Sequence, residues 1–137
     1  MADYEEIMEY RNQHNQFAAF LGIRTTEIGQ GKARGEMEIR PDMVNPINSV
    51  HGGCIFSLAD TIGGAAAASY GTKMTTISSD MHYLLPAMDV KKLYAEANII
   101  KHGKKICVCD VGIYDSNRTL IAKGTFSYYN LGMPLIN

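Results

Sequence analysis

The stretch that decides the fold is NSVHGGCIFSLADTIGGAAAA, residues 48–68. After its first turn nearly every side chain is apolar or small, which is typical of a helix buried on all sides. Two features do not fit a plain core helix. The helix begins on two glycines after His51, and Asp60 places a carboxylate inside the apolar segment, where an ionised side chain needs a cleft or a partner. This helix, predicted over residues 50–70, therefore has to carry chemistry as well as packing.

The chain as a whole has the composition of one globular domain. Its 137 residues are 46% hydrophobic, enough for one core, so we expect a single domain over residues 1–137. The formal net charge of −1 argues against a nucleic-acid or anionic-membrane surface, which needs a basic excess. No apolar run reaches the about 18 residues of a membrane span, and the first ten residues are acidic, unlike a signal peptide. With three cysteines, an odd number, we expect a cytoplasmic protein with reduced thiols.

The segments around the central helix predict one further helix and an antiparallel sheet. Apolar residues recur at helical spacing over residues 1–21, although Arg11 and His14 interrupt that face. The Gly-Gln-Gly turn at 29–31 predicts a hairpin of two short strands. Four runs rich in β-branched and aromatic residues predict a meander of consecutive strands: 74–84, 91–101, 105–114 and 119–129. The expected fold class is α+β, a sheet wrapped around one long central helix.

The start of the central helix is suited to bind an oxygen that carries negative charge. The first N–H groups of a helix have no intrahelical acceptor and carry partial positive charge. Gly52 and Gly53 lack a Cβ, so a substrate carbonyl can approach these groups as it does in an oxyanion hole. On its own, His-Gly-Gly also fits a tight turn before a helix with no further role.

Asp60 is out of reach of the N-terminus of its own helix. It follows Gly53 by seven residues, which is about 10 Å along the helix axis. A nucleophile or general base must come within about 3 Å of its target or act through one water. Two copies of the helix, packed antiparallel across a twofold axis, would bring Asp60 of one chain to the glycines of the other. We therefore expect a homodimer as the minimal unit.

Three segments carry a resemblance to a known family: NPINSVHGGCIFSLAD, TISSDMHYLLPA, and the later strands with HGKK, VGIYD and AKGTFSYY. Over residues 17–130 the chain resembles the hotdog-fold acyl-CoA thioesterases, in the branch of the PaaI-like and hydroxybenzoyl-CoA thioesterases. Their pattern has Asn or Gln six residues before the His of His-Gly-Gly and Asp or Glu nine residues after it, as Asn45, His51 and Asp60 do here. The resemblance implies a hotdog fold, a hydrolase that cleaves acyl-CoA thioesters, and a homotetramer built from the dimer. Thioester hydrolysis needs no cofactor and no metal.

The resemblance also implies roles for single residues. The Gly52 N–H would polarise the thioester carbonyl, and Asp60 of the facing subunit would be the nucleophile or the general base. Asn45 would help to place the carbonyl or the water, and Gly53 would let the substrate approach. His51 would either orient the loop or take part in catalysis. Gly52, Asp60, Asn45 and His51 belong to the expected catalytic set together with Thr76, whereas Gly53 is expected to bind substrate.

A strand hydroxyl is expected to hold the attacking water near Asp60. Counting back from Pro86 assigns this role to Thr76, whereas counting forward from Asp60 assigns it to Ser78. Both are expected on one face of the strand, because strand side chains alternate with a period of two.

The phosphates of coenzyme A need cations, and Leu85 stands where relatives carry an Arg. The remaining candidates are Arg118 and three lysines of one turn: Lys101, Lys104 and Lys105. A lysine cluster at a hairpin tip is also typical of a solvated turn.

Two other functions stay open on the sequence. An acyl-CoA hydratase or dehydratase would share the fold, but its catalytic His and carboxylate belong to a different motif. A non-catalytic acyl-CoA-binding hotdog protein would be expected to carry a DNA-binding helix-turn-helix, for which the short acidic N-terminal segment leaves no room. Hydrolysis of acyl-CoA is therefore the favoured prediction.

Overall fold

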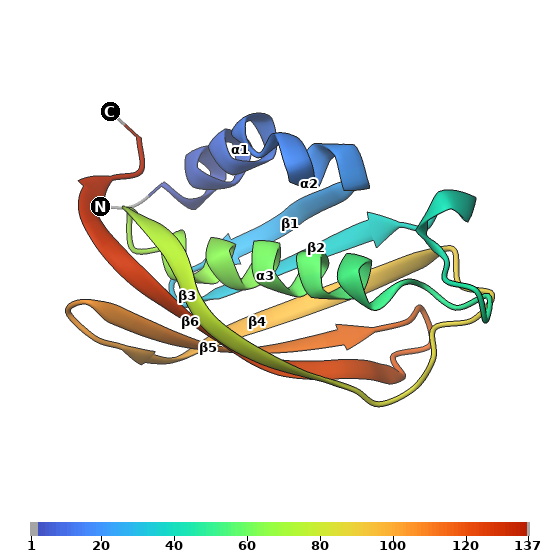
Figure 1. Cartoon of the computed structure of the whole chain (residues 1–137). Helices are drawn as coiled ribbons and strands as arrows, with labels where there is room; N and C mark the ends of the chain where they lie inside the picture. Colours follow the sequence, from blue (N-terminus) through green and yellow to red (C-terminus); the bar gives the residue numbers. More distant parts are fainter. Residues whose placement is uncertain (1–2, 137) are drawn as a thin grey trace.

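The computed structural model describes residues 3–136 and contains a six-stranded sheet that curves around one long helix (Figure 1). In chain order the elements are α1 (Tyr4–His14), α2 (Gln16–Leu21), β1 (Ile23–Gly29), β2 (Lys32–Glu38), the 3-10 helix η1 (Pro41–Met43), α3 (Gly52–Ala68), β3 (Thr72–Tyr83), β4 (Lys92–His102), β5 (Ile106–Tyr114) and β6 (Leu120–Pro134). The strand order is β1-β2-β4-β5-β6-β3, and all neighbours are antiparallel. The predicted α+β class is confirmed, as is the β1–β2 hairpin, whose turn places Gly31 at a φ of 71°.

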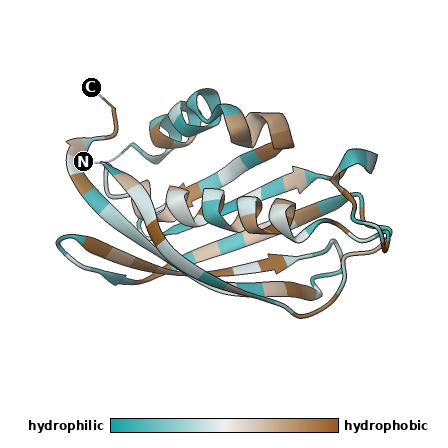
Figure 2. Ribbon diagram, viewed as in Figure 1, coloured by the Kyte–Doolittle hydropathy of each residue, from teal (hydrophilic) through white to brown (hydrophobic). Residues whose placement is uncertain are grey.

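The central helix α3 forms the core together with the inner face of the sheet. Its residues Leu58, Ala59, Ile62 and 65–68 are fully buried. Each fully buried Leu or Ile contributes about 1.5–3 kcal/mol to folding. The strands supply the large buried side chains that face the helix: Met37, Leu93, Val111, Phe126 and Tyr128. Outside this core, Figure 2 shows that α1 is largely hydrophilic, whereas α2 is hydrophobic.

Two helix boundaries differ from the prediction. The helix expected over residues 1–21 is two helices, because the side chain of Asn15 accepts a hydrogen bond from the Ala18 N–H at 3.1 Å and starts α2 anew. Residues 1 and 2 of that prediction lie outside the described residues. The central helix is shorter than 50–70 by two residues at each end, since the chain before Gly52 is held in extended bridges.

The predicted meander is correct for β4, β5 and β6 but wrong for β3, which pairs with β6 and not with β4. The segment between β3 and β4 makes no hairpin. Instead Met88 pairs with Ser49, and the Val50 N–H donates to the Ala87 carbonyl at 3.0 Å. These contacts carry the chain across the end of the sheet, beside the loop that precedes α3. As a result β3 is an edge strand next to α3, and residues 75–80 are all exposed.

Candidate active site

The start of α3 leaves one backbone N–H free. The Gly53 N–H donates to Nδ1 of His51 at 2.8 Å, and the Cys54 N–H donates to the His51 carbonyl at 2.9 Å. Within residues 3–136 the Gly52 N–H has no acceptor. The donor that was predicted to polarise a carbonyl is therefore available, whereas Gly53 does not add a second free donor.

His51 and Gly53 together make the cap of this helix. Nδ1 accepts a hydrogen bond only when it carries no proton, so this cap requires the tautomer with its proton on Nε2. A Cβ added to Gly53 would lie 3.0 Å from Nδ1, closer than an ordinary contact, so glycine makes room for the ring. A side-chain cap of this kind contributes about 0.5–2 kcal/mol. These contacts agree with the loop-orienting alternative for His51.

Asn45 holds the loop that leads to His51. Its Oδ1 accepts hydrogen bonds from the N–H groups of Ile47 and Ser49 at 3.1 and 3.0 Å, and its Nδ2 donates to Ser49 Oγ at 2.8 Å. In the described part of the chain no hydrogen bond joins its side chain to Asp60. Asn45 therefore acts on the start of α3 through the shape of the loop.

Asp60 lies in the middle of α3 on its half-exposed side. Its Oδ1 accepts a hydrogen bond from Thr76 Oγ1 at 2.8 Å. The hydroxyl of Tyr128 lies 3.3 Å from the same Oδ1 and 2.9 Å from the Asp60 carbonyl oxygen. Among residues 3–136 no group donates to Oδ2. One carboxylate oxygen is fixed, and the other is available as a nucleophile or a base.

Thr76 and Ser78 lie on opposite faces of β3. Thr76 pairs with Tyr128, and Ser78 pairs with Ser127. Between these two pairs β3 moves on by two residues while β6 moves on by one, so Ile77 is the extra residue of a β-bulge. Thr76 shares the inner face with the buried Tyr128, whereas Ser78 shares the outer face with Ser127. The expectation that both hydroxyls face the same way is wrong, because the bulge breaks the alternation between them. Thr76 is the one that contacts Asp60.

Two residues near Asp60 were missed by the sequence analysis. Besides Tyr128, Arg11 of α1 reaches α3, where its Nη2 donates to the Thr61 carbonyl at 3.1 Å. Burial lowers the pKa of Arg11, and Tyr128 and Asp60 raise it again in part. Burial, together with the Asp60 carboxylate, raises the pKa of Tyr128, which stays a neutral hydrogen-bond donor. The position of Arg11 on an otherwise apolar helix face could have indicated a buried role for it. Nothing in the sequence distinguishes Tyr128 from the other aromatic residues of the strands.

The basic turn at 101–105 is not brought together with Gly52 in one chain. It belongs to the β4–β5 hairpin, where the ring of His102 stacks on Tyr70, just after the end of α3, at 3.5 Å between ring centroids. The β4–β5 hairpin, which carries Lys101, Lys104 and Lys105, lies at the C-terminal end of α3 (Figure 1). The 17 residues of α3 span about 25 Å, so within one chain these lysines do not lie beside Gly52.

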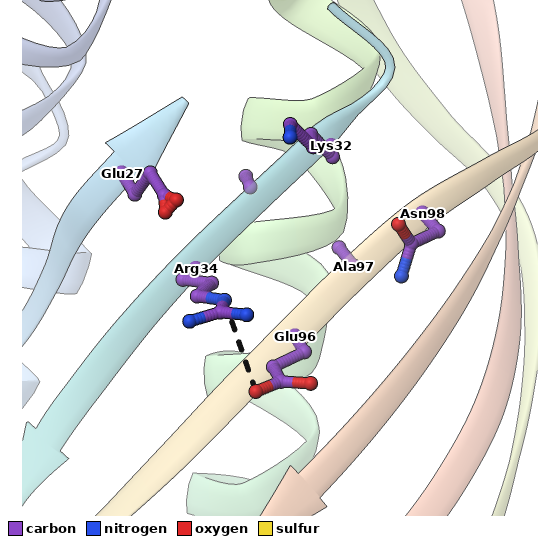
Figure 3. Close-up of a pocket in the computed structure, with 7 residues that line it drawn as sticks. Glu27, Lys32, Arg34, Glu96, Ala97 and Asn98 are labelled. Carbon is purple, nitrogen blue, oxygen red and sulfur yellow. Dashed lines mark ion pairs between the residues drawn. The ribbon is translucent and has the colours of Figure 1, made fainter. Parts of the chain in front are cut away.

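A separate hollow of about 90 Å³ lies on the outer face of the sheet (Figure 3). Figure 3 shows Arg34 and Glu96 beside each other on β2 and β4; they form an ion pair at 3.8 Å. Arg118 also donates to Glu96 at 2.7 Å, and the two arginines hold the pKa of Glu96 below its ordinary value against the effect of burial. Arg118 is therefore already engaged with Glu96, and the charged side chains that line the hollow lie on the opposite face of the sheet from Asp60.

Residues 3–136 contain no three His, Cys, Asp or Glu side chains close enough to hold a metal ion, and no helix there is long and apolar enough to cross a membrane. Cys54, Cys107 and Cys109 are free thiols, and burial raises the pKa of each. The distinguishing feature of Asp60 is that the hydroxyls of Thr76 and Tyr128 both contact its Oδ1.

The fold is that of the hotdog proteins, and the comparisons with known proteins agree. Residues 47–122 match the family model of the Thioesterase superfamily, which is more than half of the chain. The chain belongs to the thioesterase superfamily. This confirms the resemblance on which the site prediction rests.

Individual relatives place the chain near PaaI. It is 30% identical to the acyl-coenzyme A thioesterase PaaI of Escherichia coli over 82% of this chain and 84% of that protein. The structure of E. coli PaaI superposes with a TM-score of 0.91 at 26% identity, covering 96% and 95% of the two chains. A protein of Archaeoglobus fulgidus, provisionally named an esterase, is 32% identical over 95% of this chain and 86% of its own length. The hotdog fold and the likeness to PaaI are thereby established.

Proposed function

We propose that this protein hydrolyses acyl-CoA thioesters to a free acid and CoA. The observation that carries the proposal is the pair of half-sites on α3, namely the free Gly52 N–H at its start and Asp60, with one unengaged carboxylate oxygen, eight residues later. Membership of the thioesterase superfamily supports a thioester substrate. The name of the E. coli relative, an acyl-coenzyme A thioesterase, supports CoA as the thiol.

The two half-sites come from different chains in this proposal. Eight residues of helix separate Gly52 from Asp60 by about 12 Å, so one substrate carbonyl cannot meet both within a single chain. The edge strand β3, with Ile77 50% exposed, and the half-exposed side of α3 lie next to each other and are open to a second copy. Twofold antiparallel pairing there brings Asp60 to the partner's Gly52. We propose this homodimer as the minimal unit of a homotetramer.

The chemistry needs only these groups. The Gly52 N–H donates to the thioester carbonyl oxygen and stabilises the negative charge that develops on it. Asp60 either attacks the carbonyl carbon, giving a mixed anhydride that water hydrolyses, or removes a proton from the water that attacks. In both routes the C–S bond breaks, the thiolate of CoA leaves and is protonated, and the acyl group gains an oxygen from water. Thr76 keeps Oδ1 occupied and directs Oδ2 toward the substrate.

The test is thiol release from a panel of acyl-CoA thioesters by the wild type and by Asp60→Asn. Loss of the carboxylate is expected to lower the rate by about 10²- to 10⁴-fold, the range of a positioned acid or base. Asp110→Asn is the matched control, since Asp110 is paired with Lys123 on the other face of the sheet and should keep the rate within about twofold.

Unchanged hydrolysis in Asp60→Asn would overturn the proposed mechanism. Water addition to an unsaturated acyl-CoA without thiol release would instead point to a hydratase. Binding of acyl-CoA with neither reaction would point to a non-catalytic binding protein.

A further inference from the structure

The glycine pair Gly63-Gly64 in α3 is not explained by the proposed reaction. A glycine inside a helix costs about 1 kcal/mol relative to alanine. A Cβ on Gly63 would overlap the hydroxyl oxygen of Tyr128, and a Cβ on Gly64 would lie 3.1 Å from Nη2 of Arg11. The two glycines therefore open α3 to one residue from β6 and one from α1.

The space left by Gly63 lets the Tyr128 hydroxyl reach Asp60. Its side chain is 2% exposed, and its hydroxyl lies within hydrogen-bond distance of both the Asp60 carbonyl and Oδ1. A donor to a carboxylate favours the ionised form. Because Thr76 donates to the same Oδ1, the two hydroxyls hold this oxygen from β3 and from β6.

Arg11 uses its opening to place a cation behind the same carboxylate. Its Nε is buried and has no hydrogen-bond partner among residues 3–136, while Nη2 donates to the carbonyl of Thr61, the residue after Asp60. A buried cation without a counter-charge is costly. Asp60 is the carboxylate whose charge acts on Arg11.

We propose that Tyr128 and Arg11 are positioning residues that hold Asp60 and its stretch of α3 in place for thioester hydrolysis, and that Gly63-Gly64 makes room for them. This inference rests on the proposed function of Asp60. The titratable groups that face Asp60 are Tyr128 from β6 and Arg11 from α1, while β3 contributes the hydroxyl of Thr76. Neither positioning residue needs to touch the substrate.

The test is the kcat and KM of thiol release for the wild type, Tyr128→Phe and Arg11→Met. Residues that position Asp60 without touching the substrate should lower kcat and leave KM within about twofold of the wild type. We expect about a tenfold loss of kcat for each variant, which corresponds to the loss of one hydrogen bond. Arg11→Lys, which keeps the charge and a donor for the Thr61 carbonyl, should recover most of kcat.

Tyr129→Phe is the matched control, because Tyr129 is the next residue of β6 and faces the other side of the sheet. Its kcat and KM should match those of the wild type. If Tyr128→Phe and Arg11→Met remain folded and also keep the wild-type kcat, the two residues have only a structural role and the proposal is overturned.

Gly63→Ala keeps the test open if Arg11→Met does not fold. Its methyl group has to displace the Tyr128 hydroxyl, so it should lower kcat as Tyr128→Phe does and cause no further loss in the double variant. Additive losses of kcat would contradict the proposal. Failure of the proposed function would be visible separately, as a wild type without thiol release or an Asp60→Asn variant that keeps it.

Discussion

The two half-sites of α3 are built by different kinds of contact. At the start of the helix the side chains that shape the cap are close in sequence, namely Asn45 with Ser49 and His51 with Gly53, four and two positions apart. Two longer contacts also reach this end of the helix: the Val50 N–H donates to the Ala87 carbonyl at 3.0 Å, and the Tyr83 hydroxyl donates to the Gly52 carbonyl at 3.0 Å. The free N–H of Gly52 therefore depends mainly on one loop and one turn.

In the middle of the helix the contacts are long-range. Thr76 reaches Asp60 across 16 positions, Tyr128 across 68, and Arg11 reaches Thr61 across 50. These contacts exist only when the sheet has closed around α3 and α1 has packed against it. The carboxylate half is a property of the whole fold, so changes far from Asp60 in sequence should alter its chemistry, while the donor half should respond mainly to local changes.

The largest effect on the donor half is expected from Gly52→Pro. Proline removes the N–H, its fixed φ suits the first position of a helix, and His51 before it already has an extended ψ of 133°. Loss of one oxyanion donor lowers kcat by about 10²- to 10³-fold.

Gly52→Ala is its control, because it keeps the donor and adds a Cβ only 3.3 Å from the ring of Tyr83. Its expected loss of kcat is below about tenfold. Equal losses in the alanine and proline variants would mean that the space at Gly52, and not its N–H, is what matters.

A smaller effect is expected from Thr76→Val on the carboxylate half. Valine keeps the shape but removes the hydrogen bond to Asp60, which corresponds to about a tenfold loss in kcat. Ser78→Ala, on the opposite face of β3, should stay within about twofold of the wild type. A larger loss for Ser78→Ala than for Thr76→Val in the thiol-release assay would contradict the bulge at Ile77.

The smallest effect is expected from His51→Ala, on stability. Loss of the cap should lower the free energy of unfolding by about 1 kcal/mol, measured by chemical denaturation. His51→Asn supplies another good capping oxygen and should recover most of the stability and the activity. If His51→Asn is stable but as inactive as a catalytic variant, His51 takes part in the chemistry and does more than orient the loop.

The features that could be predicted from the sequence are those set by neighbouring residues. Spacing and residue type predict that the helix begins on glycine, that a hairpin turns at 29–31, and that Gly52 and Asp60 are far apart on one helix. The neighbours of β3 could not be predicted from its own residues, because pairing with β6 depends on how the segment between β3 and β4 crosses the end of the sheet.

The residues that surround Asp60 could not be predicted from the sequence for the same reason. The bulge at Ile77 has no signature in its own residues and shows only in the register against β6. Gly63-Gly64 was interpretable from sequence as close packing, but the groups that pack there, Tyr128 and Arg11, are contributed by the two ends of the chain. Their convergence on Asp60 is a result of tertiary structure.

The most direct test of the two-chain site is complementation between Gly52→Pro and Asp60→Asn. Each variant alone should be nearly inactive. When the two are co-expressed and assort at random, a site with Gly52 from one variant and Asp60 from the other is intact in about a quarter of cases. The account predicts that the mixture recovers about a quarter of the wild-type rate of thiol release, and a mixture no more active than its two components would contradict it.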